Sequence, residues 1–168
     1  PASLRRVEQA LVKRGVPTST LTARARPPLP LPPDAGPWLL DANHLTLDVG
    51  LPTWLERADV ALRILFVEHF PLARAEAAAL GVIAEIGATH PHQVRFFVGL
   101  DDPMMMAFGG ERIIALMERL GMAPDEVISH PMVSQAVVTA QRRLERRLTA
   151  TQPADSDAEW FRLNARGD

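Results

Sequence analysis

Apolar side chains recur along this chain at two different spacings, and these spacings predict where helices and strands lie. Helical intervals of three and four residues run through 3–14, through the residues after Pro71, and through 131–148. Gly15 and Pro17 are stop signals for the first helix. Pro71 and Pro131 suit the first position of a helix, where proline's missing amide is not needed.

Short runs of β-prone residues lie between these helices. The runs occupy 18–22, 37–42, 60–69 and 94–100. Helices that alternate with apolar strands predict an α/β fold with a mainly parallel sheet. The two helices expected after the last strand predict a C-terminal helical extension.

Glycine and proline mark the remaining boundaries. The segment 27–37, "PPLPLPPDAGP", predicts an extended surface loop, with a polyproline ligand for an aromatic groove as the alternative. Residues 101–121 predict a helix that is interrupted at Gly109 and Gly110 and ended by Gly121. We therefore expect an α/β domain over 1–102, a helical extension over 103–150 and a flexible acidic tail over 151–168.

Composition excludes several classes of protein. The hydrophobic content of 47% in 168 residues is typical of one folded domain with a real core. The net charge of −2 gives no overall field that would recruit nucleic acid. Cysteine is absent, which excludes disulfides and thiolate metal sites and suits the cytoplasm. Neither a signal peptide nor an apolar run of membrane-spanning length is expected.

Three histidines and two aspartates are candidates for metal or acid–base chemistry. His90 and His92, with His69 nearby in the order of the fold, could bind zinc or nickel, but histidines in a loop are usually solvated. Asp101 and Asp102 could bind magnesium, although a pair that caps the next helix is the favoured interpretation.

Two further groups are candidates for binding a partner. Residues 104–106, "MMM", could line an adaptable peptide groove, although filling of the core is favoured. Four arginines lie near the end of the last helix, where the helix dipole favours cations. They could contact a partner or acidic lipid, and they are Arg142, Arg143, Arg146 and Arg147.

The stretch 120–145, "LGMAPDEVISHPMVSQAVVTAQRRLE", resembles a segment of the SecA family, the ATP-driven motors of bacterial preprotein translocation. In that family a Leu-Gly turn leads through an acidic residue and Ile to His-Pro, Val and then Ala-Gln on a long helix. The matching residues here are Leu120, Gly121, Glu126, Ile128, His130, Pro131, Val133, Ala136, Ala140, Gln141 and Glu145.

Upstream of this stretch the resemblance continues. Residues 95–113 are similar to the family's strand, acidic pair and Phe-Gly motif. The similar residues include Arg95, Phe96, Phe97 and Asp101. A weaker, collinear resemblance covers 11–24 and 62–69. It implies the second RecA-like half of a P-loop NTPase, a three-layer domain, followed by the start of the helical scaffold. The strand before the first helix would then lie before Pro1.

The departures from the family pattern concern nucleotide chemistry. The family carries a run of arginines and a Gly-Arg-x-Gly-Arg-Gln-Gly segment, which neutralise the transferring phosphoryl group. The matching stretch here, "FPLARAEAAALGVIAEIGATHPHQ", has Arg74 as its only cation. In the matching phosphate loop Asp48 is retained without the family's glycines, and no G-x-x-x-x-G-K-[ST] occurs in the sequence. Asp48 and Arg74 are therefore vestigial candidates for nucleotide binding.

The resemblance and its departures together imply a SecA-like domain without ATPase motifs, an interaction or regulatory module in protein translocation. It would have no cofactor of its own, and ATP would bind only where a partner domain supplies the phosphate loop. Expected partners are a SecA-like half, a translocon component or a second copy. The expected location is the cytoplasm, with peripheral contact at the inner membrane.

Two alternatives remain open. The chain could be the C-terminal part of a longer SecA-type ATPase that drives preprotein export. It could also be a scaffold or dimerisation module unrelated to export. In the second case the interface would be the apolar stripe of the last helix, which includes Val133, Val137 and Leu144.

Overall fold

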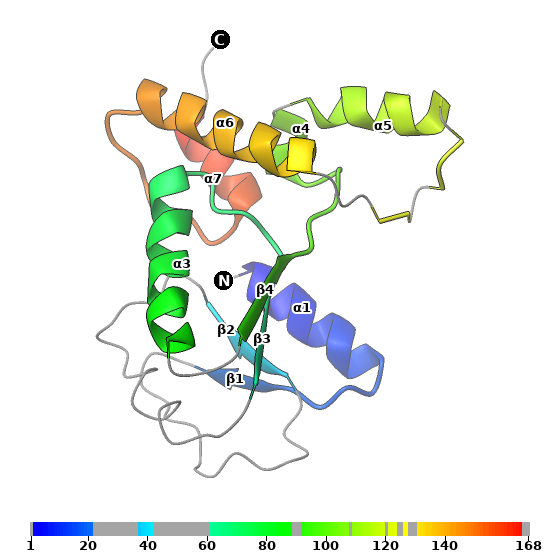
Figure 1. The fold of residues 1–168 in the computed structure, drawn as a ribbon, viewed down its shortest axis with the longest axis vertical. Coiled ribbons are helices and arrows are strands. Elements are labelled where there is room, and N and C mark those ends of the chain that lie inside the picture. The colour runs from blue at the N-terminus through cyan, green and yellow to red at the C-terminus, as the bar shows by residue number, and fades with distance from the viewer. Residues whose placement is uncertain are drawn as a thin grey trace. The chain divides into compact units, whose positions relative to one another are not determined.

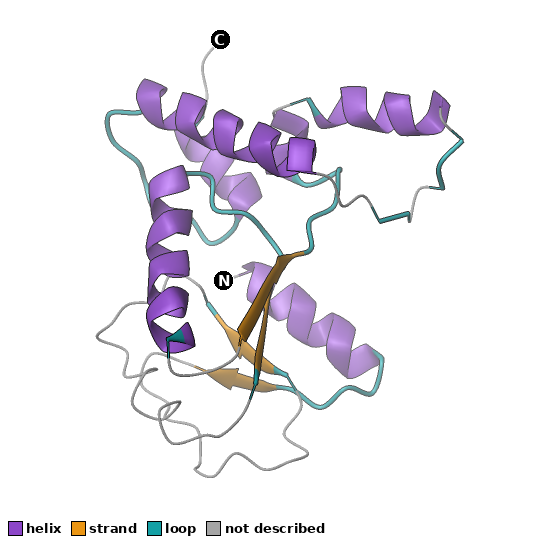
Figure 2. Cartoon of the chain, in the orientation of Figure 1, coloured by secondary structure: helices purple, strands orange, loops and turns teal. Residues whose placement is uncertain are grey.

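The computed structural model of this chain describes residues 2–21, 37–41, 61–88, 92–107, 109–119, 121–123, 126–127 and 131–165 (Figure 2). The helices are α1 (Ala2–Lys13), α3 (Ala73–Gly87), α4 (Pro103–Ala107), α5 (Gly110–Arg119), α6 (Pro131–Arg147) and α7 (Asp157–Asn164). The strands are β1 (Ser19–Leu21), β2 (Trp38–Leu40), β3 (Leu62–Phe66) and β4 (His92–Phe96). The first part of the chain contains both helices and strands (Figure 1), which confirms the predicted α/β character in its broad form.

The described residues divide into two compact units. The first unit contains 2–21, 37–41, 61–64, 77–88 and 92–94, and the second contains 65–76 and 95–165 apart from the undescribed positions. The predicted boundary between residues 102 and 103 remains a prediction. Among the described residues, no helix is both long and apolar enough to cross a membrane.

The first unit is built on a short parallel ladder. β1 pairs with β2, with Ser19 opposite Trp38, and α1 lies against β2. α1 ends as the sequence predicts, because Gly15 takes a left-handed φ of 71° that lets the chain turn. The predicted strands 18–22 and 37–42 are thus present, each as three residues.

β3 and β4 form a second pair of strands. The rings of Phe66 and Phe96 stack with centroids 4.7 Å apart, and the amide of Phe97 donates to the carbonyl of Phe66 at 2.7 Å. The prediction of a strand over 94–100 was wrong at its end, since β4 finishes at Phe96. Val98 and Leu100 instead pack against a helical core, so their apolar character reflects that core and not a sheet.

The core of the second unit joins three helices. Met104 and Met105 of α4 are buried with Val137 of α6, and Phe161 of α7 packs against them. α4 and α7 lie side by side (Figure 1). Two of the three methionines therefore fill the core, as the favoured interpretation predicts, whereas Met106 is 37% exposed.

Two adjacent glycines separate α4 from α5. Gly109 has a φ of 102°, a backbone angle that residues with a Cβ rarely adopt. A Cβ on Gly110 would lie 2.7 Å from the carbonyl oxygen of Leu100 and 2.9 Å from that of Met105. The predicted interruption is confirmed, and it results from these two steric requirements.

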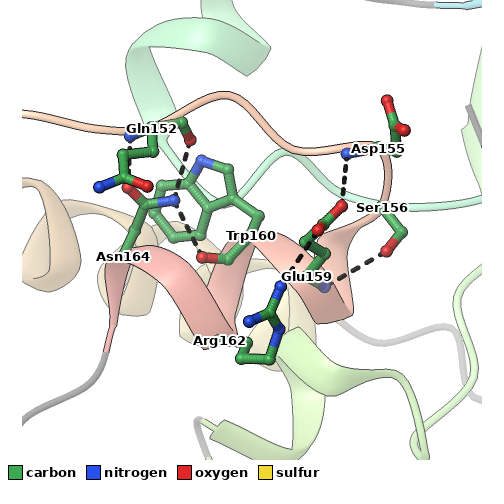
Figure 3. Close-up of polar contacts among 7 residues, drawn as sticks. All are labelled: Gln152, Asp155, Ser156, Glu159, Trp160, Arg162 and Asn164. Carbon is green, nitrogen blue, oxygen red and sulfur yellow. Dashed lines mark hydrogen bonds and ion pairs between the residues drawn. The ribbon is translucent and has the colours of Figure 1, made fainter.

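The tail predicted over 151–168 contains a helix, and in this respect the prediction was wrong. Ser156 is the N-cap of α7, and its hydroxyl accepts from the amide of Glu159 at 3.2 Å (Figure 3). Glu159 in turn accepts from the amide of Asp155 at 3.1 Å. Asn164 bonds to both the amide and the carbonyl of Gln152. These contacts fix both ends of α7 to the segment before it.

Candidate functional site

Helix α6 carries six of the eleven residues that the family resemblance singles out in 120–145. Pro131 is its first residue, as predicted. Its buried positions follow helical spacing and comprise Val137, Ala140, Gln141 and Leu144. Val137 and Leu144 are 5% and 7% exposed, so both are covered within this chain, and Val133 is half-buried against the same core. This differs from the expectation that the stripe is free to meet a second copy.

A buried polar network joins α6 to the start of α3. The side-chain amide of Gln141, 1% exposed, donates to Glu76 Oε2 at 2.9 Å and to the carbonyl of Phe70 at 2.7 Å. Glu76 Oε2 also accepts from the amide of Phe70 at 3.2 Å and lies 2.9 Å from His69 Nδ1. The carboxylate thus collects three donors on one oxygen.

The surroundings of Glu76 hold its carboxyl group in place. It lies in the first turn of α3, where the helix dipole stabilises anions. The tautomer of His69 with a proton on Nδ1 satisfies the contact. The ring of His69 stacks on Phe96 with centroids 4.4 Å apart, which holds it in place. Each hydrogen-bond donor removed from this buried carboxylate would lower the free energy of unfolding by about 1–3 kcal/mol. The network therefore fixes α6 against the segment that begins α3.

Sequence reasoning missed Glu76, although one signal was present. Leu72, Glu76 and Ala79 share one face of the helix at spacings of four and three, and both apolar members are buried. An acidic residue on a buried face requires a partner. Gln141, a member of the family pattern, supplies that partner from the far end of the chain.

A second polar pair lies where α4 and α7 begin. Asp102 Oδ1 accepts from the amide of Met104 at 3.0 Å, so Asp102 caps α4 as the favoured interpretation predicts. Burial, with the charge of Asp157 and a smaller effect of Glu68, raises the pKa of Asp102 to about 6. Asp157 Oδ2 is buried and has no hydrogen-bond partner among the described residues. A hydrogen bond between the two carboxyl groups also raises the pKa of Asp102, by less than burial and the charge of Asp157 do.

The structure does not bring the vestigial nucleotide residues together. Asp48 lies outside the described residues. Arg74 is exposed, and its backbone amide donates to Glu145 of α6 at 2.7 Å. Arg74 is the only cation within α3.

The other candidates have the following places. Arg95 and Asp101 are exposed, Phe97 is 51% exposed, and Phe96 lies in the aromatic stack. Gly121 takes a left-handed φ of 71° after α5. His130 lies outside the described residues. The four arginines of α6 are all exposed, namely Arg142, Arg143, Arg146 and Arg147.

The histidines do not assemble into a metal site in the described part of the chain. His69 contacts Glu76, His92 is exposed, and His90 lies outside that part. No group of three or more histidine, aspartate or glutamate side chains in the described ranges could hold a metal ion. The arrangement is thus suited to positioning helices, and it includes Asp102, whose pKa is raised.

Comparison with known proteins points to a single family name. No family model matches the chain. The protein translocase subunit SecA of Acidithiobacillus ferrooxidans is 46% identical over 57 residues, which cover 34% of this chain and 6% of that protein. SecA of Oleidesulfovibrio alaskensis is 49% identical over 55 residues, which cover 33% of this chain and 6% of that protein. SecA of Legionella pneumophila is 34% identical over 110 residues, which cover 62% of this chain and 12% of that protein.

This chain therefore matches no more than 12% of the length of these curated relatives. The matches recur in several organisms and at identities well above those expected by chance. They agree with the resemblance that the His-Pro and Ala-Gln pattern of 120–145 indicates. On these grounds, the chain is similar, over part of its length, to a segment of the SecA proteins.

Proposed function

We propose that this chain is a non-catalytic interaction module of SecA type that serves protein translocation, built on a degenerate RecA-like half. The observation that carries the proposal is the charge of α3. The family resemblance places a run of arginines on this helix, and here Arg74 is its only cation. The same helix uses Glu76 to bind α6, so its first turn serves a structural contact.

The missing guanidinium groups matter because phosphoryl transfer depends on charge neutralisation. An arginine that stabilises the transition state contributes about 10³–10⁵ in rate. An exposed Arg74, with no phosphate loop in the sequence, does not replace that contribution. A role through contacts with other proteins then fits the family better than hydrolysis by this chain.

The partners that this function requires are proteins. A SecA-like half, a translocon component or a second copy would each provide a surface for the exposed end of α6. Arg142, Arg143 and Arg146 offer a cationic face there. We place this module in the cytoplasm, with peripheral contact at the inner membrane.

Calorimetry tests the non-catalytic part of the proposal. Mg-ATP and Mg-ADP titrated into the chain should give no heat beyond dilution, and no phosphate should be released. Arg74→Ala serves as the matched variant, and its titration should be indistinguishable from that of the unaltered chain. Micromolar ATP binding that is lost in Arg74→Ala, with turnover, would refute the proposal.

Pulse-labelling in the native host tests the link to translocation. After depletion of this protein, a preprotein with a cleavable signal sequence should be processed more slowly, and the gene supplied in trans should restore the rate. Normal processing after complete depletion would refute a translocation role while leaving the calorimetric result intact.

The alternative of a longer ATPase is favoured by one observation, the small share of the relatives that this chain matches. An upstream reading frame that encodes a phosphate loop, continuous with this one, would support it. The dimerisation alternative is less well supported, because Val137 and Leu144 are buried within the chain.

A further inference from the structure

An open groove lies in the second unit, between the α4–α5 region and α6. Its volume is about 790 Å³, within the range of ligand-binding clefts. The lining that matters chemically consists of Met106, Ala107, Arg112, Ala136, Ala140 and Arg143. Every one of these residues belongs to the same compact unit.

One wall of the groove is a stripe of α6. Ala136, Ala140 and Arg143 follow one another at spacings of four and three, so they share a face of the helix. That face is adjacent to the buried one that contains Val137 and Gln141. The small alanine side chains leave room above the helix, and Arg143 stands at one end of the stripe.

The opposite wall depends on the glycine pair. Because Gly110 has no Cβ, α5 can start close to the carbonyls of Leu100 and Met105. The chain therefore changes direction there, and Arg112 in the first turn of α5 reaches the groove. Met106, the exposed member of the methionine run, contributes an adaptable apolar surface.

The two arginines give the groove its chemical character. The guanidinium groups of Arg112 and Arg143 make no hydrogen bond or ion pair with any described residue, and the described lining contains no acidic side chain. The chain as a whole has a net charge of −2, so this cationic site is a local feature. Guanidinium groups without partners are complementary to carboxylates.

We propose that this groove binds an acidic, amphipathic segment of a partner protein. The carboxylates of that segment pair with Arg112 and Arg143, and its apolar side chains rest on Met106, Ala107, Ala136 and Ala140. An RNA ligand is disfavoured because no aromatic side chain for base stacking is present in the described lining. This inference does not depend on the translocation role.

Fluorescence anisotropy with a designed probe tests the proposal. The probe is a labelled synthetic peptide that places leucines and glutamates on opposite faces of a helix, and the control peptide has lysines in place of the glutamates. The acidic peptide should bind and the basic one should not. Binding should weaken as salt is raised, because exposed charge pairs are screened.

Variants of the chain locate the binding site. Arg143→Glu should weaken binding about fivefold to tenfold, and Arg112→Glu should act similarly, because each replaces an attraction by a repulsion. Arg142→Glu is the matched control, an exposed arginine on the same helix that does not line the groove, and it should change affinity less than twofold. Ala136→Phe should block the groove, whereas Ser134→Phe should not.

Each contrary result overturns the proposal. These results are absence of binding, equal binding of the basic peptide, and equal effects of Arg142→Glu and Arg143→Glu. Preferential binding to anionic lipid vesicles, with no affinity for the acidic peptide, would also overturn it. Circular dichroism of each variant establishes that the loss of binding is not a loss of fold.

Discussion

Replacement of Asp102 by asparagine changes one half-buried charge and little else. Asparagine has the same shape, and its side-chain oxygen can still accept from the amide of Met104, so the cap on α4 is retained. Its amide can donate to Asp157 Oδ2, which has no donor among the described residues. The variant therefore isolates the cost of ionising Asp102.

The magnitude follows from the raised pKa of Asp102. Burial and the charge of Asp157 raise that pKa from 3.8 to about 6. Such a difference corresponds to about 3 kcal/mol at 1.36 kcal/mol per pKa unit. Because Asp102 is partly exposed to water, we reduce the expected effect to about 1–2 kcal/mol.

The sign of the effect follows from proton binding. The folded chain holds the proton of Asp102 more tightly than the unfolded chain does, so this group favours folding at low pH. Its contribution to the free energy of unfolding falls as the pH rises from about 4 to about 6, and it is constant above that range. Asp102→Asn should remove this fall and should be more stable than the unaltered chain at pH 7.5.

Urea denaturation at a series of pH values between 4.5 and 8 measures the effect. The quantity of interest is the difference in unfolding free energy between Asp102→Asn and the unaltered chain, because other carboxylates contribute equally to both. Asp101→Asn is the control for loss of an exposed neighbouring charge. A difference that stays flat with pH, or a variant that is less stable at pH 7.5, would refute the reasoning.

Three further substitutions, two of them with a matched control, test the packing. Gln141→Ala should lower the free energy of unfolding by about 1–3 kcal/mol in urea denaturation, since the buried carboxylate of α3 loses a donor. Gln135→Ala, exposed on the same helix, should change it by less than about 0.5 kcal/mol. Gly110→Ala should lower the melting temperature because its Cβ meets backbone oxygens, whereas Gly81→Ala, with open space around it, should raise stability by about 0.5–1 kcal/mol. The opposite order would contradict the steric argument. Val137→Asp should unfold the chain, so its circular dichroism should lose helical signal; a folded variant with altered sedimentation would instead favour an exposed interface.

Local signals predicted much of the fold. α1 was expected over 3–14 and occupies Ala2–Lys13, because Gly15 takes a left-handed backbone that stops the helix. α6 begins at Pro131 as expected, since proline fits the first helical turn. In both cases the deciding interaction lies within a few residues, and the sequence displays it directly.

The predictions were wrong where contacts distant in the sequence, or a helix cap that was overlooked, determine the local structure. Val98 and Leu100 have β-prone surroundings, but packing against Met104 takes them out of the strand. α7 was missed although Ser156 and Glu159 have the spacing of a capping box. The acidic composition of that segment suggested a tail, and the cap was not weighed against it.

The candidate site was predicted only in part. Gln141 was identified through the family pattern, but its partner Glu76 lies 65 residues away, and no local rule pairs them. The groove with Arg112 and Arg143 depends on how α5 leaves the glycine pair, which a sequence pattern does not specify. The spacing of residues identified which side chains share a helix face, but only the structure showed what each face packs against.

The bond between Glu76 and Gln141 also has a consequence for synthesis on the ribosome. The second unit is assembled from 65–76 and from 95 onward, so its first part emerges long before its last. Until Gln141 has left the exit tunnel of the ribosome, the carboxylate of Glu76 can accept hydrogen bonds only from water and from its near neighbours in the sequence. A nascent chain halted before that point would expose this half-built surface, and such intermediates are the species that chaperones bind.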